Sequence, residues 1–131
     1  MNIERFSPSV DNLVACLCAR WCKTCEAYES TFESVVNQLR QTYPHLKMAW
    51  VDVEDQADLM GDIDIENFPT LLIRTKGINQ FFGVVLPHAS TFQRLAENYL
   101  SSEANVPVKL NEDNTNIDMF IQRLMDESLL R

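Results

Sequence analysis

The hydrophobic positions of the chain fall into short apolar runs and into longer segments with a helical period. Four runs are short enough for strands: 13–19, 48–53, 70–75 and 80–86. Three segments are predicted to be helices, the middle one short and weakened by a glycine: 23–43, 55–62 and 90–100. Pro44 ends the first helix, and Ser90 can cap the last.

The order of these elements is strand, helix, strand, helix, two strands, helix. Lys76-Gly77 separates the last two strands, which are therefore expected to form a hairpin. This order predicts an α/β fold with a mixed central sheet and helices on both faces. Beyond it, 101–114 is polar and reads as a loop in which 106–110 can be extended, and an apolar stripe predicts a further helix over 115–129.

Composition narrows the class of protein. With 131 residues, the chain is expected to be one domain, 1–131, with a core at about 10–100 and a C-terminal extension at 101–131. Its net charge of −8 argues against binding to nucleic acid or to an anionic membrane. No apolar run approaches the ~20 residues of a membrane span. Residues 1–6 lack the apolar segment of a secretory signal, so we expect a cytoplasmic protein.

The four cysteines lie within ten residues of one another: Cys16, Cys18, Cys22 and Cys25. They cannot staple distant loops together, so they form one local chemical site. Two cysteines three positions apart at the start of a helix suit dithiol–disulfide exchange. Four thiolates could instead bind zinc or an iron–sulfur cluster. Because two of them lie in an apolar strand without surrounding loops, we expect no metal and no cofactor.

Three features at matching separations resemble the thioredoxin family. They are Trp21-Cys22-x-x-Cys25 between a strand and a long helix, the strand Val51-Asp52-Val53-Glu54, and Phe68-Pro69-Thr70 at the entry of the hairpin. Pro69 lies 44 residues after Cys25. The resemblance covers 13–100, about two-thirds of the chain. It implies a thioredoxin-like fold and a cis peptide bond before Pro69.

The resemblance also implies roles for the site residues. Cys22, at a helix N-terminus beside Lys23, would be the exposed nucleophile, and Cys25 would resolve the mixed disulfide. Cys22 and Cys25 would form the redox-active disulfide. Trp21, Phe68 and Pro69 would bind the substrate. The implied partners are protein disulfides and a donor similar to thioredoxin reductase, and the implied role is in cell redox homeostasis.

Some positions depart from the family pattern. Lys23-Thr24 stands between the cysteines where typical thioredoxins have Gly-Pro. The buried aspartate of the family corresponds to Cys16 and its lysine partner to Trp50, so both members of that charge pair are replaced. The strand tryptophan of the family corresponds to Cys18. Cys16 and Cys18 share one face of a strand, either as small buried hydrophobic residues or as an auxiliary redox pair or thiol relay.

The two ends of the chain also differ from the family. Only 21 residues precede Cys22, too few for the usual opening strand and helix before the next strand. The apolar stripe of the C-terminal helix would therefore cover the sheet of its own domain, or else form a dimer seam or a partner-binding arm. A second functional hypothesis follows from the missing charge pair: a non-catalytic thioredoxin-fold module that binds a protein and carries a regulatory or vestigial disulfide.

Overall fold

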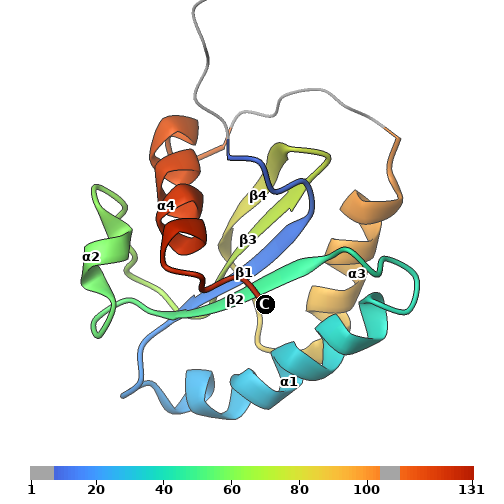
Figure 1. Ribbon diagram of the computed structural model, residues 1–131. Helices are drawn as coiled ribbons and strands as arrows, with labels where there is room; N and C mark the ends of the chain where they lie inside the picture. Colours follow the sequence, from blue (N-terminus) through green and yellow to red (C-terminus); the bar gives the residue numbers. More distant parts are fainter. Residues whose placement is uncertain (1–7, 104–109) are drawn as a thin grey trace, which may run out of the picture.

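The computed structural model describes residues 8–103 and 110–131, and its centre is a mixed sheet (Figure 1). The strand order is β2-β1-β3-β4. Their bounds are β1 Leu13–Cys18, β2 Lys47–Asp52, β3 Thr70–Thr75 and β4 Ile78–Val84. β1 pairs with β2 in parallel and with β3 antiparallel, and β3 and β4 form the predicted hairpin. Lys76 and Gly77 both have positive φ at its tip, as tight hairpin turns require.

Helices cover both faces of the sheet. α1 (Lys23–Leu39) and α3 (Ala89–Ser101) lie on one face, and α2 (Ala57–Met60) and α4 (Asn114–Asp126) lie on the other (Figure 1). The predicted α/β class, with a mixed sheet flanked by helices, is confirmed. α1 ends earlier than predicted because the chain tightens after Leu39, whose carbonyl accepts a hydrogen bond from the Thr42 N–H, three residues on, at 3.1 Å. None of the helices in the described ranges is long and apolar enough to cross a membrane.

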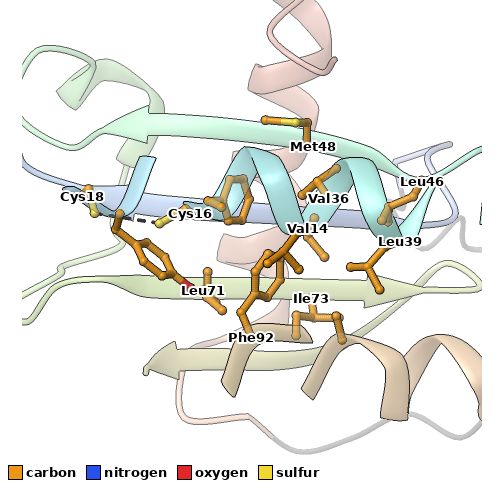
Figure 2. Close-up of a cluster of buried hydrophobic side chains, with 14 of the residues drawn as sticks. Val14, Cys16, Cys18, Val36, Leu39, Leu46, Met48, Leu71, Ile73 and Phe92 are labelled. Carbon is orange, nitrogen blue, oxygen red and sulfur yellow. Dashed lines mark hydrogen bonds between the residues drawn. The ribbon is translucent and has the colours of Figure 1, made fainter. Parts of the chain in front are cut away.

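β1 is buried on both faces, and its alternating side chains divide the core in two. Leu13, Ala15 and Leu17 pack toward α2 and α4. Cys16 and Cys18 belong to the opposite cluster, which α1 and α3 cover. Figure 2 shows this second cluster, with the two cysteines side by side at one end of it. The strand thus brings both sulfur atoms to the layer that contains the CxxC helix.

The C-terminal extension completes the second layer of the molecule. The stripe of α4 is fully buried against the protein's own sheet: Ile117, Phe120, Ile121 and Leu124. The prediction of intramolecular packing is therefore confirmed, and a dimer seam through this stripe is not supported. The main chain of Arg131 exchanges two hydrogen bonds with that of Met48 at the edge of β2. The expected extended stretch at 106–110 lies almost wholly outside the described residues.

A buried arginine joins α4 to the sheet. The Arg74 guanidinium on β3 donates to Asp118 of α4 at 3.0 Å and to Asn79 of β4 at 2.8 Å. It also donates to the carbonyl oxygens of Pro8 and Val10. Arg74 is only 1% exposed, so this charge depends on its partners for solvation inside the protein.

Candidate active site

The CxxC motif occupies the start of α1, as its sequence predicts. Cys22 is the N-cap residue of the helix, and its side chain is half-buried. Its N–H donates to the Ala19 carbonyl at 3.0 Å in the turn that links β1 to α1. Cys25 lies one turn further along and is only 2% exposed. The expected order of exposure, with Cys22 outside and Cys25 inside, is confirmed.

The disulfide in the structure corrects one prediction. Cys25 is bonded to Cys18, whereas Cys22 is a free thiol. The predicted Cys22–Cys25 disulfide is therefore not the one that the structure contains. The reason lies in the fold: Cys18 ends β1 on the face toward α1, and its Cα is 5.8 Å from that of Cys25. That separation is ordinary for a disulfide.

Cys16 is a second free thiol, fully buried beneath the helix. Its Sγ lies 3.8 Å from the Sγ of Cys18, the contact marked by the dashed line in Figure 2. Because a disulfide sulfur carries no hydrogen, the Cys16 S–H is the donor. Burial, together with the negative charge of Glu29, raises the pKa of the Cys16 thiol. The prediction that Cys16 is buried and reduced is confirmed.

The pairing of two cysteines also bears on the four-thiolate metal site considered above. A disulfide cannot supply thiolate ligands, so Cys18 and Cys25 are not ligands in this state. Within 8–103 and 110–131, no group of three or more histidine, cysteine or carboxylate side chains is arranged to hold a metal ion. A disulfide with free thiols nearby is instead suited to thiol–disulfide exchange.

Of the predicted substrate-binding residues, Trp21 directly precedes Cys22 and contacts Phe68, whereas Pro69 is buried. Trp21 is 65% exposed, and its ring meets that of Phe68 edge-on with centroids 5.8 Å apart. The Phe68–Pro69 bond is cis, as predicted. The Val85 N–H donates to the Pro69 carbonyl at 3.1 Å, which ties this loop to the end of β4. Exposed aromatic surface therefore adjoins the free thiol at the helix N-terminus.

Apolar groups fill the site of the family's buried charge pair. Cys16 and Trp50 are direct partners in the register of β1 and β2. The Trp50 ring packs on those of Tyr28 and Phe32. The Tyr28 hydroxyl is buried without a hydrogen-bond partner among the described residues, and burial raises its pKa. The replacement of both charges leaves no uncompensated charge at this position.

A cavity of about 440 Å³ opens beside the disulfide. Cys18 and Cys25 form part of its wall. Three carboxylates line the same cavity: Glu26, Glu29 and Asp52. In the absence of a buried aspartate, these groups are the candidates for accepting a proton from a thiol on this side of α1.

The sequence predicted the position of Cys18, on the face of its strand toward α1, but did not predict its bond to Cys25. Its position on the face toward the helix that bears Cys25 was the available signal. The strong local spacing of Cys22 and Cys25 favoured a disulfide within the motif. A comparison of the end of β1 with the first turn of the helix would have identified Cys18 as the alternative partner.

Comparison with known proteins agrees with this architecture. The family model described as Thioredoxin matches residues 3–106. The chain belongs to the thioredoxin family. Protein disulfide-isomerase A4 of Rattus norvegicus is 32% identical over 76 residues, which is 58% of this chain and 12% of that protein. The chain thus spans about an eighth of the length of the curated relatives that it matches.

Solved structures show the same fold. A variant thioredoxin from Halobacterium salinarum is 25% identical, with a TM-score of 0.56 over 74% of this chain and 79% of that one. Thioredoxin O1 from Arabidopsis thaliana in the oxidised state is 19% identical, with a TM-score of 0.55 over 74% and 84% of the two chains. Zinc-bound human ERp44 is 17% identical, with a TM-score of 0.59 over 68% of this chain and 27% of that one.

Proposed function

We propose that this protein is a thiol–disulfide oxidoreductase that acts on protein disulfides through Cys22 and Cys25. One observation carries the proposal: a free, half-buried thiol at the N-terminus of α1 beside exposed Trp21, with a buried cysteine one turn behind it. Membership of the thioredoxin family and similarity to protein disulfide-isomerase A4 support the same activity.

The proposed reaction has two exchanges. The reaction starts from protein whose Cys18–Cys25 disulfide a dithiol donor has reduced to two thiols. The Cys22 thiolate attacks one sulfur of a substrate disulfide, and the other sulfur leaves as a thiolate and takes up a proton. Cys25 then attacks the Cys22 sulfur and releases the second substrate thiol. The protein ends with one disulfide and the substrate with two thiols. Glu26 or Glu29 can take the proton that Cys25 loses, since both line the cavity beside it.

The substrate surface is expected to be apolar and extended. Trp21 and Leu86 are each 65% exposed, and Val84 is 54% exposed. Val84 and Leu86 flank Val85, which is bonded to the cis-proline loop. An extended peptide with apolar side chains would cover this surface. We also propose that a donor similar to thioredoxin reductase reduces the protein. We propose a cytoplasmic location, which cell fractionation would test.

The test is turnover of a protein disulfide such as insulin with dithiothreitol as the donor. Wild-type protein is expected to accelerate the reduction, and Cys22→Ser to lose at least about 100-fold of that rate because the attacking sulfur is gone. The matched control is Cys16→Ala, a nearby buried cysteine that is expected to keep the rate within a few-fold. Equal rates with wild type and Cys22→Ser would contradict the proposal.

A second candidate is a protein-binding module without turnover. The observation that favours it is the Cys18–Cys25 disulfide, which leaves Cys22 without its resolving partner. This module would use the same Trp21 and Phe68 surface to hold a protein. Binding of a partner by Cys22→Ser as tightly as by wild type, with no turnover by either, would support this candidate over the oxidoreductase.

A further inference from the structure

Two cysteines, Cys18 and Cys22, lie near Cys25, and either could form a disulfide with it. Cys25 is bonded to Cys18 at the end of β1, and it is also one helical turn from Cys22 at the N-cap of α1. The two possible partners of Cys25 differ in environment. Cys18 is 1% exposed, whereas Cys22 is half-buried and reaches the surface beside Trp21. One of the two disulfides is therefore internal and the other superficial.

We propose that Cys18 is a third exchange cysteine of the redox centre, which takes Cys25 from Cys22 and holds the disulfide inside the protein. This inference rests on the oxidoreductase function proposed above. In the exchange, a Cys18 thiolate attacks the Cys25 sulfur of a Cys22–Cys25 disulfide. The sulfur–sulfur bond to Cys22 breaks, that to Cys18 forms, and Cys22 leaves as a thiolate that takes up a proton. The step needs no external oxidant or reductant.

The internal disulfide has a consequence for the direction of the reaction. After a substrate has been reduced, its thiols can attack a superficial Cys22–Cys25 disulfide and reverse the reaction. They have little access to a disulfide between Cys18 and Cys25, which are 1% and 2% exposed. Transfer of the disulfide to Cys18 therefore opposes reoxidation of the product and frees Cys22 as a thiol. The centre returns to the superficial disulfide only when Cys22 attacks Cys25.

Cys16 does not compete for this role. Its sulfur is 3.8 Å from that of Cys18, but Cys25 is bonded to Cys18 and not to Cys16. Cys16 and Cys18 are equally buried, so position and not burial separates them: Cys18 ends β1, and its Cα is 5.8 Å from that of Cys25. Cys16 is therefore the matched control for Cys18, on the same strand, on the same face and equally buried.

Trypsin can separate the possibilities because Arg20 and Lys23 divide the cysteines among three peptides. Residues 6–20 carry Cys16 and Cys18, 21–23 carry Cys22, and 24–40 carry Cys25. The full chain is oxidised, its free thiols are alkylated at mildly acidic pH, and the digest is mapped by mass spectrometry without reduction. We expect peptide 6–20 linked to 24–40, with the alkyl group on peptide 21–23.

Two variants assign the linkage. Cys16→Ala is expected to give the wild-type map, and Cys18→Ala to give only the link between 21–23 and 24–40. A wild-type map that contains only that second link would overturn the inference. Because this result needs no variant, a failure of Cys18→Ala to fold would leave the test intact.

The rate of reduction tests the exchange itself. Oxidised wild-type protein and oxidised Cys22→Ser are treated with reduced glutathione, and the loss of the 6–20 to 24–40 link is followed. Cys22→Ser is expected to lose the link at least about tenfold more slowly, because the half-buried thiol one helical turn from Cys25 is gone. Equal rates would overturn the proposed exchange. Insulin turnover measured alongside distinguishes the exchange through Cys18 from the oxidoreductase function. Turnover without the 6–20 to 24–40 link would contradict the role of Cys18 alone. The same link without turnover would contradict the oxidoreductase function alone.

Discussion

At the scale of single residues, the four cysteines differ in their surroundings more than in their distance along the chain. Cys22 lies at a helix N-terminus with access to solvent, and Cys25 and Cys18 share a buried disulfide. Cys16 is a thiol with no exposed surface. The alternation of side chains along β1 and the first turn of α1 place each cysteine. That placement decides whether each sulfur is exposed or buried, and bonded or free.

The buried thiol of Cys16 predicts a dependence of stability on pH. Its pKa is raised in the folded protein above its ordinary value of 9.0, so the unfolded chain loses this proton at lower pH than the folded one. The contribution of the Cys16 thiol to the free energy of unfolding is fully present below pH 9. It falls as the pH rises toward the pKa of the folded state, by at most about 1.4 kcal/mol per pH unit.

Urea unfolding of the fully reduced protein between neutral and alkaline pH would measure this effect. Cys16→Ala is expected to lose less stability than wild type over the alkaline range, since it lacks the titrating group. The comparison uses the change in unfolding free energy with pH. Any pH-independent loss of stability caused by the substitution therefore cancels. Parallel curves for the two proteins would contradict the assignment.

At the scale of elements, periodicity and turn residues were enough to predict the type and order of the described helices and strands, with ends that differ from the observed ones by at most four residues. The apolar runs predicted all four strands, and Lys76-Gly77 predicted the hairpin. The spacing within Trp21-Cys22-x-x-Cys25 predicted which cysteine would be exposed. The sequence made Cys18 a possible partner of Cys25, because its strand face looks toward α1. It could not decide between Cys18 and Cys22, because that depends on how closely the end of β1 approaches α1. The role of Arg74 was also missed, since its partners are far apart in sequence.

The contact between Arg74 and Asp118 predicts how strongly α4 is held. Asp118→Ala removes an ion pair to a guanidinium that is only 1% exposed, and it is expected to cost about 1.5–3 kcal/mol of unfolding free energy. The matched control is Asp126→Ala, on the same helix but exposed, which is expected to change stability by less than about 0.5 kcal/mol. Denaturant titration of both variants would measure the difference, and equal stabilities would show that the pair does not anchor the helix.

At the scale of the whole molecule, the C-terminal segment completes the second layer of the fold. α4 covers the face of the sheet that α1 and α3 leave open, and Arg131 pairs with the edge of β2 (Figure 1). The result is a sheet covered on both faces, with the cysteines at the end of β1 and the start of α1. The half-buried thiol of Cys22 and the exposed Trp21 therefore lie next to each other at the start of α1.

The role of Cys22 as the nucleophile can be tested directly by trapping the covalent intermediate of the reaction. Reduced Cys25→Ser is mixed with a protein disulfide, and the product is digested with trypsin without reduction. We expect a mixed disulfide between peptide 21–23, which carries Cys22, and a peptide of the substrate. This adduct should accumulate because the resolving thiol is missing. An adduct only on peptide 6–20, or no adduct under conditions in which wild-type protein reduces the substrate, would contradict Cys22 as the nucleophile.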